Sequence, residues 1–168
     1  VDTPQRPGTR KGAIRVALEA RLRDAAPDVP TLIVRAGDFY GPGARQSWFS
    51  QAMVKPGRPL RRILHPGPDA GHAWAYLPDL AESIARLLDP DVPLRAVEHV
   101  PFPGHFDPDG RAMVDAVRRA VGRAVPVRRF PWWAMRALAP FGGFPREALE
   151  IAPSWRHAQR LDGGRLAE

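Results

Sequence analysis

The sequence predicts an α/β fold built around a parallel sheet. The chain has 168 residues, 44% of them hydrophobic, which is enough for one globular domain with its own core. Residues 31–34, Thr-Leu-Ile-Val, form a short apolar and β-branched run of the kind that is buried on both faces of a parallel sheet. Helical and strand-like patterns also alternate along the chain, which is typical of α/β proteins.

The first predicted element is an amphipathic helix over residues 11–26. Its apolar face carries Ile14, Leu18 and Leu22 at four-residue spacing. The buried strand comes next, and it runs directly into a glycine-rich segment, residues 35–43, that we expect to be a turn-rich loop.

The later elements are predicted from their end signals as well as their periodicity. Pro78 suits the first turn of a helix over residues 78–88, and Asp107 is a good cap for a helix over residues 107–123. The other predicted elements are a short helix at residues 47–54, strands at 61–64, 73–77 and 96–100, and helices at 130–138 and 146–151.

Composition excludes several classes of protein. The net charge of +7 comes from arginine, since Lys11 and Lys55 are the only lysines, and the arginines are spread along the chain, which disfavours nucleic-acid binding. No apolar run approaches the roughly 18 residues of a membrane span, so we expect no membrane partner. The absence of cysteine fits a cytoplasmic protein, and the five scattered histidines predict no metal site.

The segment after the buried strand is the first candidate for a functional site. In open α/β sheets, ligands bind outside the carboxyl ends of the strands, where residues 35–43 are expected to lie. The alternative is a plain turn in which Gly41, Pro42 and Gly43 only bend the chain.

Three segments then resemble family motifs. Residues 35–42, Arg-Ala-Gly-Asp-Phe-Tyr-Gly-Pro, resemble an R-x-x-N-x-Y-G-P segment. Residues 72–81, His-Ala-Trp-Ala-Tyr-Leu-Pro-Asp-Leu-Ala, resemble R-D-F-x-Y-V-D-D-L-A, and residues 7–12 with Glu19 beyond them resemble P-x-S-x-Y-G-x-x-K-x-x-x-E. The three patterns and their order resemble those of the extended short-chain dehydrogenase/reductase superfamily, in its NAD-dependent epimerase/dehydratase family.

This resemblance implies the C-terminal portion of a Rossmann-type doubly wound parallel sheet plus a small α/β substrate-binding subdomain. It also implies NAD or NADP as cofactor, a small-molecule substrate and hydride transfer as the reaction type. The residues that it places at the cofactor are Arg35, Tyr40, Gly41 and Pro42. The residues that it places at the substrate are Asp38, Phe39, Ser47, Trp48, His72 and Tyr76.

The catalytic pair departs from the family pattern. Where the family has a tyrosine that moves the substrate proton and a lysine four residues later, this chain has Lys11 and Arg15. Residues four apart share a helix face, so the spacing is kept. A desolvated lysine can act as acid or base, whereas arginine cannot lose its proton. Lys11 and Arg15 are therefore the candidate catalytic residues, and the alternative is two basic residues at an exposed helix start.

Two further departures concern the substrate. His72 stands where sugar-nucleotide epimerases of the family have an arginine that clamps diphosphate, and histidine lacks the bidentate fork that suits phosphate. Asp38 stands where an asparagine usually contacts substrate, and its carboxylate would repel phosphate. Both changes point away from a nucleoside-diphosphate sugar and toward an uncharged or cationic ligand.

The family's glycine fingerprint, G-x-x-G-x-x-G, does not occur in this sequence. We therefore expect a fragment or a natural truncation, with residues 1–125 forming late strands and helices of the NAD(P)-binding domain interleaved with substrate-binding segments. Residues 126–168 are expected to form a helical substrate-side extension. Two functions stay open, an epimerase/dehydratase-like oxidoreductase and a non-catalytic member that senses a dinucleotide or other ligand, with a basic nucleic-acid-binding module as a third. The oligomeric state also stays open, with a homodimer as one candidate.

Overall fold

The structure, a computed structural model, describes residues 4–67 and 69–166. Its strands are β1 (Thr31–Arg35), β2 (Asp38–Tyr40), β3 (Ile63–His65), β4 (His72–Tyr76), β5 (Val97–Pro101), β6 (His105–Asp107) and β7 (Val127–Arg129). Its α-helices are α1 (Arg10–Ala25), α2 (Leu77–Leu87), α3 (Arg111–Val121), α4 (Trp132–Leu138) and α5 (Gly143–Ile151). A π-helical turn covers Phe49–Met53, and short 3₁₀ turns cover Ala139–Phe141, Ala152–Trp155 and Gly164–Leu166.

The strands of the described residues form small sheets in which parallel pairing dominates. β1 pairs in parallel with β5, and β3 pairs in parallel with β7. β4 lies at the centre of a three-stranded sheet, parallel to β2 and antiparallel to β6. The protein therefore has the mixed α/β architecture that the sequence predicts, consistent with part of a Rossmann-like fold.

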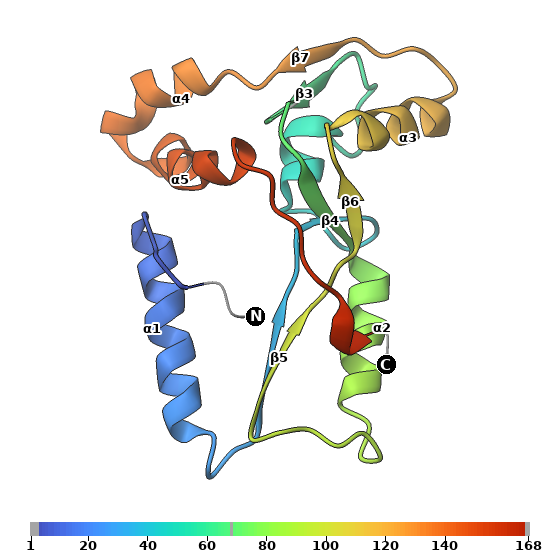
Figure 1. The fold of residues 1–168 in the computed structure, drawn as a ribbon. Coiled ribbons are helices and arrows are strands. Elements are labelled where there is room, and N and C mark those ends of the chain that lie inside the picture. The colour runs from blue at the N-terminus through green and yellow to red at the C-terminus, as the bar shows by residue number, and fades with distance from the viewer. Residues whose placement is uncertain (1–3, 68, 167–168) are drawn as a thin grey trace.

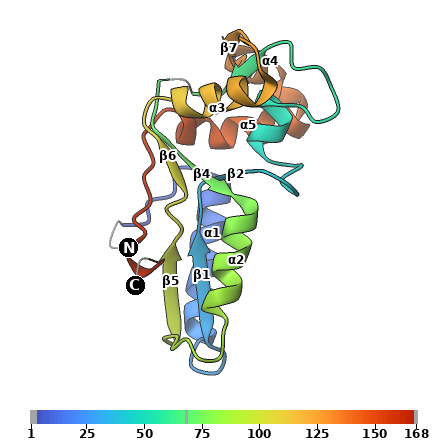
Figure 2. The same ribbon diagram turned by 90° about the vertical axis from the view of Figure 1, so that its right-hand side faces the viewer.

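Helices lie on both sides of the β1–β5 pair, with α1 on one side and α2 on the other (Figures 1 and 2). Helix α2 packs its apolar face, including Leu80 and Ile84, against Val34 of β1 and Ala75 of β4. The opposite half of the molecule holds β3, β7 and helices α3 to α5 (Figure 1). From there the chain returns along β5 and ends its described part at Leu166, which packs in the same apolar cluster as Leu80.

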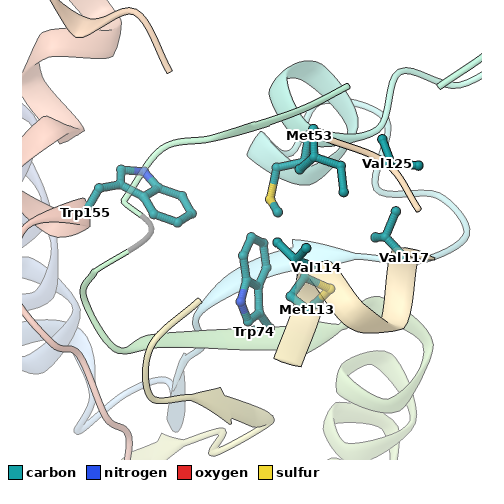
Figure 3. Close-up of a cluster of buried hydrophobic side chains, with 8 residues drawn as sticks. Met53, Trp74, Met113, Val114, Val117, Val125 and Trp155 are labelled. Carbon is teal, nitrogen blue, oxygen red and sulfur yellow. The ribbon is translucent and has the colours of Figure 1, made fainter. Parts of the chain in front are cut away.

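The larger apolar core lies in the half that contains α3. Met53 from the π-helical turn, Trp74 from β4 and Val114 from α3 meet there with Trp155, which comes from the C-terminal segment (Figure 3). Trp74 is fully buried and Trp155 is 2% exposed. Because these residues lie far apart in sequence, burying them brings β4, α3 and the C-terminal segment together.

Several predicted elements need correction. The segment of residues 35–43 is not one loop, because residues 38–40 form β2, which leaves the β1–β5 pair and joins β4. Gly37 permits this crossing, since a Cβ there would lie 2.0 Å from the carbonyl oxygen of Ala73. β1 itself is only half-buried, and the predicted short helix is a π-helical turn.

Helix α1 also differs from its prediction. None of its residues is buried, and Ile14 and Leu18 are 57% and 53% exposed. Among the described residues, α1 is held instead by polar contacts, such as the 2.6 Å hydrogen bond that Arg35 of β1 donates to Glu19. The apolar spacing thus predicted a helix correctly but not the burial of its apolar face.

Helix α3 begins later than predicted because residues 105–107 form β6. Asp107 still caps the helix from the end of that strand. Its carboxylate oxygens accept hydrogen bonds from the backbone N–H groups of Ala112 and Met113, at 3.3 and 2.9 Å. This satisfies two of the unpaired donors at the start of the helix.

Candidate active site

The candidate site is a cavity of about 680 Å³ that lies beside the start of α1 and is lined also by α4, α5 and the π-helical turn. A volume of this size falls within the range of roughly 300–1,000 Å³ that is usual for small-molecule sites. Two of the residues that the sequence singled out line it, Lys11 and Trp48. It is therefore a place where two of the predicted site residues meet a space large enough for a ligand.

Aromatic rings form one wall of the cavity. The ring of Trp48 lies 5.3 Å from that of Phe130, nearly edge-on, and 6.1 Å from that of Phe144. These separations are typical of aromatic pairs that pack with mutual attraction. Met135 of α4 and Ala148 of α5 extend the apolar lining. The wall is thus suited to contact with an apolar or planar group.

Lys11 reaches the cavity from the first turn of α1. Thr9 caps this helix, since its hydroxyl accepts a hydrogen bond from Gly12 N–H at 3.1 Å. The ammonium of Lys11 forms an ion pair with Glu147 of α5, and its backbone N–H donates to Glu150 at 3.1 Å. The hydrogen bond and the positive charge of Lys11 lower the pKa of Glu147 below its usual value. The side chain of Lys11 is thus engaged by a carboxylate of α5.

Arg15 is not brought to the same place. It is exposed one turn further along α1, and it lies outside the cavity lining as the described residues define it. The cavity reaches only the first turn of α1, where α5 approaches. Lys11 and Arg15 therefore do not face one ligand together in this structure.

Asp38 and His72 are paired with each other. His72 Nε2 lies 2.7 Å from the Asp38 carboxylate, and the His72 side chain is only 4% exposed. The imidazole also stacks on the indole of Trp155, with ring centres 3.7 Å apart and an angle of 10° between the planes. Asp38 lies on β2 and His72 on the neighbouring strand β4, so the pair links two strands of one sheet. The polar atoms of this pair are therefore used in a contact within the chain.

Tyr40, Gly41 and Tyr76 form one packed group at the end of β2 and β4. The two tyrosine rings lie 5.3 Å apart, and burial, followed by the charge of Asp79, raises the pKa of Tyr40. Gly41 has a φ of +98°, and a Cβ there would lie 2.4 Å from Cε2 of Tyr76. Glycine is therefore required at position 41 by the tyrosine ring of this same chain.

The other predicted residues have local roles or are exposed. Ser47 Oγ donates to the carbonyl of Ala44 at 2.8 Å and accepts from Ser50 N–H at 3.2 Å, so it organises the start of the π-helical turn. Phe39 is 41% exposed, and Pro42 is exposed as well. Neither lines the cavity as far as the described residues define it.

The residues implied at the cofactor do not by themselves form a site for NAD or NADP. Arg35 is bound by Glu19, whose pKa is lowered although burial alone would raise it, because Arg35 and Gln5 donate hydrogen bonds to it. Tyr40 and Gly41 pack against Tyr76 of the same chain. The sequence also lacks the glycine fingerprint whose backbone N–H groups cradle a pyrophosphate.

Sequence reasoning missed several residues of the cavity. Lys55 follows the π-helical turn, and Glu147 comes from α5, more than a hundred positions after Lys11. Lys55 could have been noticed as the second of two lysines in an arginine-rich chain. Glu147 and Phe144 carry no motif, because only the folding of α5 onto α1 brings them to the cavity.

Among residues 4–67 and 69–166, no group of three or more acidic or histidine side chains is arranged to hold a metal ion. Within the described part of the chain, no helix is both long and apolar enough to cross a membrane. Trp132 packs against Trp48 and donates its indole N–H to the carbonyl of Pro66 at 2.7 Å. Trp133 is 74% exposed.

Comparison with known proteins supports the fold. No family model and no curated protein sequence matches the chain. Among solved structures, the chain is similar to UDP-glucose 4-epimerase from Bifidobacterium longum, determined in complex with NAD+ and UDP, with a TM-score of 0.56 and 17% sequence identity. The match covers 77% of this chain and 45% of the epimerase chain. The protein therefore has an epimerase-like α/β fold and spans less than half of that neighbour.

Proposed function

We propose that this chain supplies the substrate-binding side of an NAD(P)-dependent epimerase/dehydratase-like oxidoreductase. The cavity beside Lys11 and Trp48 is the proposed substrate site. The observation that supports this proposal is the position of Lys11. It stands where the resembled family has its proton-transferring tyrosine, and it lines the cavity of about 680 Å³.

The epimerase of similar structure was solved with NAD+ and UDP, which makes NAD the cofactor to test first. When bound, a nicotinamide cofactor supplies hydride transfer. The described residues do not form its cradle, so the role proposed for this chain is limited to the small molecule. The aromatic wall around Trp48 contacts its apolar part, and α4 and α5 exclude water from one side of the cavity.

A second candidate function is ligand binding without catalysis in the same cavity. The ion pair between Lys11 and Glu147 favours it, because Glu147 of the same chain occupies the side chain that the catalytic role needs at the substrate. The exposed position of Arg15 favours it further, since no second residue from α1 completes a proton-transfer pair.

Nicotinamide turnover tests the proposal and separates the two candidates. The protein in its full natural length is incubated with NAD+ or NADP+ and a panel of secondary alcohols while the absorbance of reduced nicotinamide is followed. Binding of NAD+, UDP and the panel compounds is measured in parallel by calorimetry. We expect turnover that Lys11→Met abolishes and that Arg21→Met, an exposed change on the same helix, leaves unchanged.

Glu147→Gln provides a further control, since it breaks the same ion pair but keeps the lysine. Turnover that survives Glu147→Gln and not Lys11→Met assigns the effect to the Lys11 amine rather than to the contact between α1 and α5. Binding of a panel compound without any turnover supports the ligand-binding candidate. If nothing binds and nothing turns over, both candidates are wrong.

A further inference from the structure

Of the charged side chains that line the cavity, two form an ion pair with each other and one does not. Lys11, Lys55 and Glu147 all line it. Glu147 neutralises Lys11 through their ion pair, and Glu150 lies close enough to accept a hydrogen bond from the Lys11 backbone. For Lys55 the structure gives no ion pair with any described residue. One unneutralised positive charge therefore remains at the cavity.

Most of the remaining lining is apolar. The rings of Trp48, Phe130 and Phe144 form its aromatic wall, and Leu64 and Ile151 add aliphatic surface. Gln46 and Gln51 are polar but uncharged. An occupant thus meets a large apolar surface and two ammonium groups, of which that of Lys11 is paired with Glu147. Such a combination selects a molecule with an apolar body and one negative charge.

We propose that the cavity binds an apolar, preferably aromatic, monocarboxylate, with its ring against Trp48 and its carboxylate on Lys55. This assignment rests on the proposed function of the cavity as the substrate site. A hydrogen-bonded pair between ammonium and carboxylate is stronger than a neutral contact, especially at the edge of an apolar wall. The aromatic wall then contributes affinity through buried apolar area and ring stacking.

Other ligand charges fit the cavity less well. A nucleoside diphosphate carries several negative charges, more than the one unpaired ammonium of Lys55 matches in the cavity lining, and Arg10 and Arg146 act on Glu147 without lining the cavity as described. His72 does not offset the negative charges, because it is buried against Trp155 and paired with Asp38. A cationic ligand is disfavoured by Lys55 itself, since like charges repel at close range. The proposed ligand is therefore an anion, which differs from the uncharged or cationic ligand that Asp38 and His72 suggested from sequence.

Binding of matched probes tests the inference. Trans-cinnamate, its neutral amide cinnamamide, phenethylammonium and UDP are titrated into the full 168-residue chain by calorimetry at low salt. We expect cinnamate to bind about tenfold more tightly than cinnamamide, as a charge-assisted hydrogen bond at a partly open site predicts. Lys55→Met is expected to remove this preference, and Lys55→Glu to reverse it toward phenethylammonium.

Arg58→Met is the matched control, because it removes the same charge from the same connecting segment but does not line the cavity as described. It is expected to leave the preference for cinnamate unchanged. Circular dichroism confirms that each variant keeps the wild-type secondary structure, which is expected because Lys55 and Arg58 are both exposed.

The inference is wrong if cinnamamide or phenethylammonium binds as tightly as cinnamate, if UDP binds most tightly, or if Lys55→Met keeps the preference. Failure of the proposed function has a different signature. A preference for cinnamate that depends on Lys55, together with a full-length protein that shows no nicotinamide turnover, supports the ligand class and contradicts the oxidoreductase. Turnover of uncharged alcohols only, without binding of cinnamate, supports the oxidoreductase and contradicts the ligand class.

Discussion

Trp155 is expected to hold the C-terminal segment, and with it the cavity, in place. It is 2% exposed, stacks on His72 and lies 5.7 Å from the ring of Trp74. A buried tryptophan removes about 200 Å² from water, which at about 25 cal/mol per Å² corresponds to about 5 kcal/mol. Its Nε1 is buried without a hydrogen-bond partner, and this offsets about 1–2 kcal/mol of the gain. Trp155→Ala should therefore lower the free energy of unfolding by about 3–4 kcal/mol.

Urea denaturation followed by far-ultraviolet circular dichroism measures this change. Trp133→Ala is the matched control, because Trp133 is 74% exposed and its loss should cost less than about 0.5 kcal/mol. Trp155→Phe keeps an aromatic ring and removes the unpartnered N–H, so its cost should stay below about 2 kcal/mol. If Trp155→Ala changes the free energy of unfolding by no more than Trp133→Ala, the C-terminal segment does not contribute to the core and the reasoning fails.

Two further changes follow from the same half of the molecule. Gly41→Ala should cost about 1–3 kcal/mol, since φ at Gly41 is +98° and the new Cβ would overlap Tyr76; an unchanged thermal midpoint would contradict this reading of the turn. His65 is fully buried, and burial lowers its pKa below the ordinary 6.5. The unfolded chain therefore binds a proton more readily, so the free energy of unfolding should fall by at most about 1.4 kcal/mol per unit as pH drops below 6.5 toward about 5. Urea midpoints across this range check the slope, and His65→Gln should flatten it.

Elements with strong local signals were predicted well from the sequence. The strand at residues 31–34 is β1, the helix predicted at residues 78–88 is α2, and the strand at 96–100 is β5, each within one or two residues. These segments carry their signals within a few positions, as a β-branched run or as Pro78 at a first helical turn. Local chemistry is enough to predict these elements, because the residues that signal each one lie within the element itself.

Pairing and burial could not be predicted in the same way. Nothing near residues 38–40 shows that they form a strand, because β2 exists through its hydrogen bonds with β4, more than thirty positions later. The same holds for β7, which pairs with β3 across about sixty positions. Helix α1 shows the converse, since its apolar spacing is real but Ile14 and Leu18 remain exposed in the described structure. Periodicity reports that a face is apolar, and only tertiary contacts decide whether it is covered.

One contact between residues far apart in sequence changes what the spacing of Lys11 and Arg15 predicts about the site. By spacing alone, Lys11 and Arg15 are a candidate proton-transfer pair, since four residues bring them to one helix face. The approach of α5 to the first turn of α1 gives Lys11 a carboxylate partner in Glu147 and leaves Arg15 outside the cavity. The Lys11 side chain is therefore already partnered within the chain. The charge that selects the ligand is then that of Lys55, a residue outside every motif, so substitution at position 55 should change which molecule binds, whereas substitution at position 11 should change whether chemistry follows.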